Sequence, residues 1–411
     1  MNKLRVGICG WGNVATGLFK TLQTNSVEIK KRSNLEIEII AIGARRDNPK
    51  CDPGNVIIER DIFNIIDHDI DVIVELIGGV DVARDLILKA LNAKKHVVTA
   101  NKAVIFNHGD ELFSVANKNG VKLLYESSVC AGTPIIKLLN QELAASKISK
   151  ISGMLNGTSN FILSNMEEGM EFEPTLKLAQ EKGYAEPDPS FDIEGTDAAH
   201  KIGILSSLAF GSSLPLKDFY IEGINGIHKD DFKYAYEMGY TIKHLAIAKS
   251  TKNNSIDLRA HPSLVKLDSY LANLKGVRNG IEVETDLLGT LHIAGSGAGQ
   301  EATASGVISD LIYLSDSKIR EVNNINESSE LIDFIDLDFQ YYFYIEASDV
   351  SGVMASISSI FANKDVSIES ISQKENLNDD LVPIIIITDP FKEKDYQELV
   401  DNLLELDSVN K

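Results

Sequence analysis

The first third of the chain alternates short β-branched runs with helix-length segments, and this rhythm restricts the possible folds more than any other feature. The predicted strands between residues 4 and 127 are LRVGICG, LEIEIIAIGA, IDVIVELIGG, HVVTA and VKLLYES. They are apolar at nearly every position, as expected when helices cover both faces of a parallel sheet. Residues 1–132 are therefore predicted to form an α/β domain with a doubly wound parallel sheet of the Rossmann type.

A glycine motif follows the first predicted strand. Gly10, Gly12 and Ala15 form the pattern G-x-G-x-x-A. The first glycine permits a tight turn, the second lets the backbone approach a pyrophosphate, and the third small residue lets the helix pack closely. The amides of Asn13 and Val14 would then face the phosphates. A glycine turn in another kind of α/β protein is the alternative, but the strand-turn-helix context favours nucleotide binding.

Three further positions in this domain are candidates for cofactor contact. The second predicted strand ends in GARR, and Arg45 and Arg46 can pair with a 2′-phosphate, which favours NADP; NAD stays possible, and two solvated arginines are the alternative. Gly78 ends the third predicted strand. Lys102, in TANKA, begins a helix after the fourth, at the sheet edge where ligands bind. The helix dipole disfavours a lysine there, which favours a functional role.

The pattern changes after residue 132. Helices are predicted over IIKLLNQELAAS and TDAAHKIGILSSLAF and strands over KISKISGML and DLLGTLHIAGS, so residues 133–320 form an α+β domain, with its last helix able to pack back on the first domain. The polar, acidic segment 321–338 is a predicted linker. Residues 339–411 suit a small third domain.

Composition excludes several classes of partner. A net charge of −20 without a basic cluster argues against nucleic acid. No apolar run approaches the roughly 20 residues of a membrane span, and the first residues lack a signal-peptide pattern. The cysteines Cys9, Cys51 and Cys130 have no metal-type spacing. We expect a cytoplasmic protein with a small-molecule substrate.

The acidic stretch AEPDPSFDIEGTDAAHK, residues 185–201, ends in a predicted helix. Asp197 and Lys201 lie four positions apart and share a face of that helix. This spacing is also typical of a solvated salt bridge. However, apolar residues one turn away on each side place Lys201 on an apolar stripe, so it is expected to be partly buried and to need a partner.

Four ordered blocks resemble homoserine dehydrogenase along the first 320 residues: TANKA, GMLNGTSNFIL, GYAEPDPSFDIEGTDAAHKIGIL, and GSGAG followed by TASGVISDL. Residues 341–390, with DVSGVMASIS and VSIESISQKE, resemble an ACT domain of the βαββαβ, ferredoxin-like type. The resemblance is to the monofunctional form and not to the aspartokinase fusion. It implies NADPH- or NADH-dependent interconversion of L-aspartate 4-semialdehyde and L-homoserine, in threonine and methionine biosynthesis, by a homodimer or homotetramer whose second domain is the catalytic and dimerisation domain.

The resemblance also implies roles for individual residues. Lys201 matches the proton donor and Lys102 the lysine near nicotinamide and substrate, while Asp197 matches the carboxylate that binds substrate and orients Lys201. Glu186 matches the residue that holds the substrate amino group. Tyr184 contacts substrate or simply packs.

The remaining acids of this stretch, Asp188 and Asp192, are expected to be solvated loop charges.

The family also binds a monovalent cation, usually Na⁺, through backbone oxygens. The matching positions are Glu126, Val129, Ala131 and Thr133, although this loop reads SSVCAGTP where the family's usual form is richer in glycine.

In the C-terminal region, Asp349 and Gly352 lie in the turn where ACT domains bind amino acids, and threonine is the expected effector; an ACT domain that only dimerises is the alternative. A sensor of NADP and an amino acid that catalyses nothing would keep the glycine turn and this domain. It would not need Lys102, Lys201, Asp197 and Glu186 together. Another dehydrogenase acting on a related amino-acid carbonyl would have no reason to keep GMLNGTSNFIL and GTDAAHK in this order.

Overall fold

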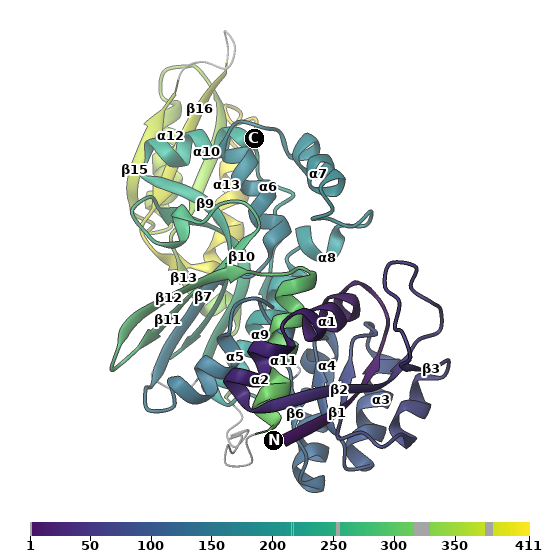
Figure 1. Ribbon diagram of the computed structural model, residues 1–411. Helices are drawn as coiled ribbons and strands as arrows, with labels where there is room; N and C mark the ends of the chain where they lie inside the picture. The colour runs from purple at the N-terminus through teal and green to yellow at the C-terminus, as the bar shows by residue number, and fades with distance from the viewer. Residues whose placement is uncertain (1, 215, 217, 252–254, 316–328, 375–380) are drawn as a thin grey trace.

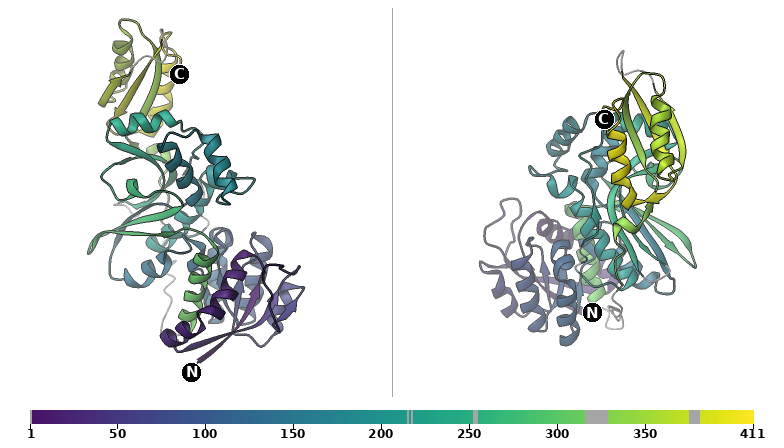
Figure 2. Two further views of the ribbon diagram at one scale, coloured as in Figure 1. Left: turned by 45° about the horizontal axis from the view of Figure 1, so that its top comes forward. Right: turned by 180° about the vertical axis from the view of Figure 1, so that it is seen from behind.

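The computed structural model describes residues 2–214, 216, 218–251, 255–315, 329–374 and 381–411. Figure 1 shows three units that follow one another along the molecule in chain order, and the views in Figure 2 agree, with the two termini at opposite ends. Residues 321–328 of the predicted linker lie outside the described residues.

The first unit is built on a six-stranded parallel sheet with the order β3-β2-β1-β4-β5-β6. This is the strand order common to dinucleotide-binding folds, in which ligands bind where the order reverses, here between β1 and β4. The predicted parallel sheet is confirmed. The sequence missed β3, because three residues are too few to produce a recognisable pattern. The strands are β1 (Asn2–Cys9), β2 (Leu35–Gly43), β3 (Ile57–Glu59), β4 (Val72–Glu75), β5 (His96–Thr99) and β6 (Leu123–Leu124).

Helices cover both faces of this sheet, which explains why its strands are apolar throughout. Besides the four helices within the unit, α11 (Gln300–Leu314) returns from the second unit and packs against α1. Its residues Ala304, Val307 and Leu311 are buried in the same hydrophobic cluster as β1. Close approach is possible because α1 has Gly17, where a Cβ atom would lie 2.6 Å from Gln300 Cγ. The four helices are α1 (Asn13–Thr24), α2 (Ser26–Ser33), α3 (Asp81–Asn92) and α4 (Lys102–Asn119).

The second unit contains a six-stranded sheet with the order β12-β11-β7-β9-β10-β8, antiparallel except for the β8–β10 pair. Its central helix, α9, packs against β7, β9 and β10. The α-helix predicted over IIKLLNQELAAS is shorter in the structure. It ends at Lys137, and a π-helical turn from Leu138 to Glu142 follows it. The strands are β7 (Ile148–Met154), β8 (Tyr220–Ile221), β9 (Tyr240–Ser250), β10 (Ile256–Lys266), β11 (Arg278–Thr285) and β12 (Gly289–Ser296); the helices are α5 (Ile135–Lys137), α6 (Gly157–Glu167), α7 (Phe172–Glu181), α8 (Ser190–Ile193), α9 (Thr196–Phe210) and α10 (Lys229–Glu237).

The C-terminal unit has a three-stranded antiparallel sheet with the order β14-β16-β15. A single bridge between Ala347 and Val409 brings the end of the chain beside β14. Residues of both helices share one hydrophobic cluster with the sheet. The elements are β13 (Asp338–Phe339), β14 (Tyr342–Ser348), α12 (Val353–Asn363), β15 (Ile368–Gln373), β16 (Leu381–Thr388), β17 (Phe391–Lys392) and α13 (Tyr396–Leu404).

Polar and aromatic contacts join this unit to the second one. Tyr342 Oη donates to Asp231 Oδ1 at 3.0 Å, and Phe334, in the segment that leads into β13, stacks on Tyr220 with ring centroids 3.9 Å apart. Both contacts involve edge elements of the second unit, α10 and β8. Among the described residues, no helix combines the length and the apolar character that a membrane crossing requires.

Candidate active site

The glycine motif forms an open turn at the carboxyl end of β1. Gly10 has φ 105°, and a Cβ atom there would lie 2.5 Å from the carbonyl oxygen of Leu76, just after β4, so only glycine fits. Gly12 caps α1, and a Cβ atom there would meet nothing within 4 Å. Ala15, by contrast, is fully buried. The helix therefore packs closely on the sheet, while its first two residues keep contact with solvent, Asn13 exposed and Val14 half-buried.

A pocket of about 250 Å³ lies beside this turn, between Trp11 and Arg46. Asn48 shapes its rim by donating to the Trp11 carbonyl oxygen at 3.0 Å. Arg45 and Arg46 follow β2 and are exposed. Gly78, with φ 72° and nothing near its Cβ position, lies across the turn after β4. These residues fit a dinucleotide bound where the strand order reverses.

Buried polar contacts at the ends of β4 and β5 fix the position of Lys102. Glu75 at the end of β4 accepts a hydrogen bond of 2.5 Å from Thr99 Oγ1 at the end of β5. Burial raises the pKa of Glu75. Asn101 then caps α4 by accepting from Val104 N at 3.2 Å, so Lys102 begins the helix at a fixed point beside the strand-order reversal.

Asp197 lies between two lysines from different units. Lys201 Nζ donates to Asp197 Oδ2 at 2.6 Å and to the Leu155 carbonyl oxygen at 2.6 Å. Lys102 Nζ lies 3.0 Å from Asp197 Oδ1. Asp197 and Lys201 are 4% and 7% exposed, whereas the Lys102 side chain is 31% exposed. One buried carboxylate thus orients both ammonium groups.

The charges in this cluster stabilise one another. Burial opposes the charge of Asp197, but Lys201 and Lys102 outweigh it, so the pKa of Asp197 is lowered. Burial likewise opposes the charge of Lys201, and Asp197 outweighs it and raises the pKa of Lys201. Asp197 and Lys201 therefore favour each other's charged form. Lys102 adds a second basic side chain 3.0 Å from Asp197, and such an arrangement suits a reaction that develops negative charge on oxygen.

Asn156 is a member of the site that sequence reasoning missed. Its Nδ2 donates to Asp197 Oδ2 at 2.8 Å and to Asp192 Oδ1 at 2.7 Å, while its Oδ1 caps α6 by accepting from Ser159 N. The expectation that Asp192 is a solvated loop charge is therefore wrong: the residue is half-buried and burial raises its pKa. An asparagine before a helix signals a cap, but its contact with Asp197 is tertiary.

Asn279 and His200 also surround the cluster. Asn279 Nδ2 donates to the Leu155 carbonyl oxygen at 2.7 Å, the same oxygen that accepts from Lys201. His200 stacks on Phe106 with centroids 4.2 Å apart and meets Phe191 edge-on. Burial and the charge of Lys102 lower the pKa of His200. His200 lies within the block GTDAAHK, but nothing in the sequence gave it a role, and no motif marked Asn279.

Glu186 and Tyr184 lie on the exposed loop before α8. Tyr184 is 43% exposed and packs edge-on against Phe161, and its carbonyl oxygen accepts from Thr158 Oγ1 at 2.7 Å. The Glu186 carboxylate is exposed, and none of the described contacts joins it to Asp197 or Lys201. Asp188 is exposed, as expected, and accepts from Ser190.

The expected cation-binding positions lie in a buried loop. The Glu126 carboxylate accepts from Ile136 N and Lys137 N, each at 2.9 Å. Burial and the nearby charge of Asp310 raise the pKa of Glu126 to about 7. Val129 and Ala131 are buried, as is Thr133, whose hydroxyl oxygen has no hydrogen-bond partner within the part of the chain that the structure describes. Within the described ranges, no cluster of three His, Cys, Asp or Glu side chains could hold a metal.

The sheet order, the open glycine turn and the lysine-flanked carboxylate together define an NAD(P)-dependent oxidoreductase. Comparison with known proteins narrows the class. Residues 10–126 match the family model for the NAD-binding domain of homoserine dehydrogenase, and residues 134–312 match the homoserine dehydrogenase model. The chain belongs to the homoserine dehydrogenase family and has that enzyme function, so the resemblance in its sequence is confirmed.

Individual relatives cover nearly the whole chain. It is 43% identical to the homoserine dehydrogenase of Pseudomonas aeruginosa, across 100% of this chain and 97% of that protein. The crystal structure of a homoserine dehydrogenase from Thiobacillus denitrificans superposes with a TM-score of 0.93 at 37% identity, across 100% of this chain and 97% of that one. A hyperthermophilic archaeal homoserine dehydrogenase in complex with NADPH has a TM-score of 0.66 at 26% identity, across 78% of this chain and 99% of that one.

We expect Asp197→Ala to lower the free energy of unfolding by about 3–5 kcal/mol at pH 7, because it leaves the buried Lys201 without its partner. Urea denaturation measures this. The difference from the unsubstituted protein should shrink as pH falls below the unfolded pKa of 3.8, since a carboxyl whose folded pKa is lowered stabilises the fold in full above the unfolded pKa and loses that contribution as pH falls toward its folded pKa. Asp188→Ala, at an exposed acid in the loop before α8, should leave the denaturation midpoint unchanged; an equal effect of both variants would contradict the prediction.

Proposed function

We propose that this chain interconverts L-aspartate 4-semialdehyde and L-homoserine with NADPH, and that Asp197, Lys201 and Lys102 form its catalytic centre. The observation that supports this most directly is the buried Asp197 carboxylate with an ammonium group on each oxygen, 2.6 and 3.0 Å away. The bound nicotinamide supplies or accepts the hydride. The side chains supply orientation, charge and the proton.

Lys201 is the proton donor in the direction of reduction. Its ammonium has three N–H groups, and Asp197 and Leu155 accept two of them. The third donates to the aldehyde oxygen of the substrate. As negative charge grows on that oxygen, the proton passes from Nζ to it, giving the hydroxyl of homoserine and a neutral amine whose two remaining N–H groups still donate to Asp197 and Leu155.

Lys102 provides a fixed positive charge for the same oxygen. It is partly exposed, lies on the side of the first unit and remains tied to Asp197, so it need not reorganise during the reaction. Glu186 and Tyr184 bind the amino-acid part of the substrate: the exposed Glu186 carboxylate is free to meet an ammonium group, and the hydrogen bond from Thr158 anchors the loop.

NADP is the preferred cofactor in this proposal. Gly10, Gly12, Asn13, Val14 and Ala15 surround the pyrophosphate. Support for the 2′-phosphate comes from two exposed arginines directly after β2, one of which lines the pocket beside Trp11.

A Na⁺ ion is proposed for the loop of Glu126, Val129, Ala131 and Thr133, supported by the buried, unpartnered hydroxyl oxygen of Thr133.

We further propose three domains, 1–132, 133–320 and 339–411, with the last an ACT domain. Its strand order, with the end of the chain beside β14, is that of a ferredoxin-like βαββαβ sheet, although the final strand is reduced to one bridge at Val409. Asp349 and Gly352 precede α12, and Gly352 caps it with φ 99°. These positions suit an amino-acid effector, threonine, bound between two copies in a homodimer or homotetramer.

A cytoplasmic location is part of the proposal. All three cysteines, Cys9, Cys51 and Cys130, are buried free thiols, which suits a reducing compartment.

A steady-state assay tests the proposed function. The purified chain should oxidise NADPH in the presence of aspartate 4-semialdehyde, and Lys201→Ala should lower kcat by about 10²- to 10⁴-fold, with NADPH affinity little changed, because only the proton donor is lost. Lys177→Ala, on α7, is the matched control. Absence of activity with intact NADPH binding would favour the rival interpretation, a non-catalytic sensor of NADP and an amino acid. Near-normal turnover of Lys201→Ala would remove Lys201 from the mechanism.

The double variant Arg45→Ala, Arg46→Ala tests the cofactor. We expect kcat/KM with NADPH to fall by about 10-fold or more while kcat/KM with NADH changes little, since only NADPH carries the 2′-phosphate. Arg32→Ala, on exposed α2, serves as the control. A chain that uses NADH as well as or better than NADPH contradicts the preference.

Threonine added to the same assay tests the effector. Inhibition is expected, and Asp349→Ala should weaken it at least several-fold by linkage between the two sites, whereas the exposed acid variant Asp407→Ala should not. Activity that ignores threonine would leave the C-terminal unit as a dimer contact or as a sensor of a different ligand.

A further inference from the structure

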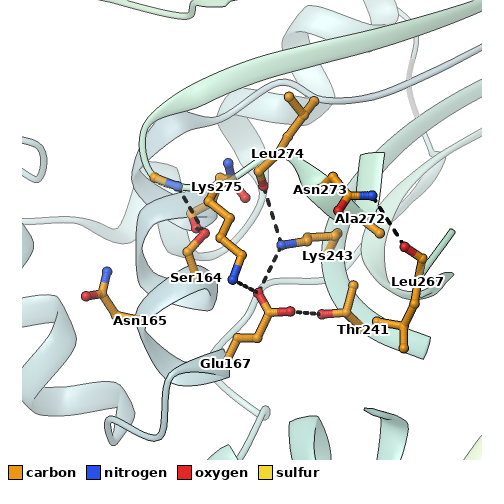
Figure 3. Close-up of polar contacts among 12 residues, drawn as sticks. Ser164, Asn165, Glu167, Thr241, Lys243, Leu267, Ala272, Asn273, Leu274 and Lys275 are labelled. Atoms are coloured by element: carbon orange, nitrogen blue, oxygen red, sulfur yellow. Dashed lines mark hydrogen bonds and ion pairs between the residues drawn. The ribbon is translucent and has the colours of Figure 1, made fainter. Parts of the chain in front are cut away.

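The segment of residues 274–279, called the strap below, runs along α6 toward the catalytic centre. At its far end the Leu274 carbonyl oxygen lies 3.5 Å from Nζ of the fully buried Lys243, which also meets Glu167 at 3.5 Å, as Figure 3 shows. Lys275 adds a contact of 3.7 Å to Glu167. In the middle, Gly276 N donates to Ser164 Oγ at 3.2 Å. The strap is thus attached along the length of the helix.

Asn279, at the near end of the strap, touches both the catalytic centre and the loop before α5. Its side chain is fully buried. Nδ2 donates to the Leu155 carbonyl oxygen at 2.7 Å and to Cys130 Sγ at 3.1 Å. The first contact fixes the orientation of the amide, because the reverse orientation would place two carbonyl oxygens together.

The Leu155 carbonyl oxygen is shared by two donors, Asn279 Nδ2 and Lys201 Nζ. The oxygen holds one of the three N–H groups of Lys201, and Asp197 holds a second. The direction of the third N–H group, toward the substrate, therefore depends on the position of the Leu155 carbonyl oxygen.

At this buried position, an asparagine that served packing alone would lower the stability of the fold. Its Oδ1 is buried and has no hydrogen-bond partner among the described residues. The side chain is also tightly packed, since a Cβ atom on Gly297 would lie 2.1 Å from that oxygen. A leucine of the same shape would avoid the unpaired oxygen. The contact of Nδ2 with Leu155 gives the amide a function that leucine cannot replace.

We propose that Asn279 is a positioning residue for Lys201: by holding the Leu155 carbonyl oxygen, it sets the direction in which the Lys201 ammonium presents its free N–H to the substrate. This inference rests on the proposed role of Lys201 as proton donor. Asn279 itself touches neither substrate nor cofactor.

Asn279→Leu tests the proposal with little change of shape. We expect kcat to fall by about 10- to 100-fold, because misdirecting a catalytic group by a fraction of an ångström to one ångström has effects of this size. The KM for NADPH should stay within about twofold. The alkaline limb of the kcat–pH profile should move to lower pH, since an ammonium that loses a well-held acceptor gives up its proton more easily.

Asn160→Leu is a closely matched control. Asn160 is a buried asparagine on α6 whose Nδ2 donates to one carbonyl oxygen of the strap, that of Arg278 at 3.1 Å, and whose Oδ1 also lacks a partner. It does not contact Leu155 or Lys201 in the described structure. This variant should keep the kcat and the alkaline limb of the unsubstituted chain, even where it shifts the thermal midpoint.

The outcomes separate this inference from the proposed function. If Lys201→Ala abolishes turnover but Asn279→Leu behaves like Asn160→Leu in kcat and pH profile, Asn279 is structural only and the inference is overturned. If Lys201→Ala turns over normally, both proposals fall. Asn279→Ala, which removes atoms without adding any, provides the same three measurements if the leucine variant does not fold.

Discussion

The structure depends above all on one buried carboxylate that must be neutralised. Asp197 lies at the start of α9 with almost no contact with solvent, and an uncompensated charge at such a position would be strongly destabilising. Two lysines form ion pairs with this carboxylate, Lys201 from the same helix and Lys102 from the first unit. The interaction that stabilises this position therefore also joins the nucleotide-binding sheet to the second sheet.

The rest of the architecture keeps these groups in register. Glu75 and Thr99 tie the ends of β4 and β5 together beneath Lys102. Asn156 holds Asp197 while capping α6, and α11 crosses back to close the first unit against α1. A hydride donor and a proton donor have to meet within about 3 Å of the same carbonyl, and rigid helix and strand ends can maintain that geometry better than loops can.

The exposed loop of Glu186 and Tyr184 contrasts with this rigid centre. Its acids Glu186 and Asp188 are at the surface, and its contacts with α6 include the hydrogen bond from Thr158 to the Tyr184 carbonyl oxygen and the packing of the Tyr184 ring on Phe161. A substrate binding there would meet a preformed pair of ammonium groups and a more adjustable carboxylate. Such a division agrees with a proposal in which the chemistry is preorganised and the amino-acid part of the substrate is bound from the loop.

The sequence by itself determined the parallel sheet, the glycine turn, the α9 helix and the Asp197–Lys201 pair, because each of these depends on local periodicity or on residues four positions apart. It could not reveal that Asp192 is half-buried, that Asn156 serves both a helix and a carboxylate, or that β3 extends the sheet. Only the tertiary structure brought Lys102, Leu155 and Asn279 to the same pair of charged groups. The hydrogen bond from Asn156 to Asp197 joins residues 41 positions apart, and the one from Asn279 to Leu155 joins residues 124 positions apart. Contacts over such separations are set by how the two sheets pack, and they leave no periodic trace in the sequence.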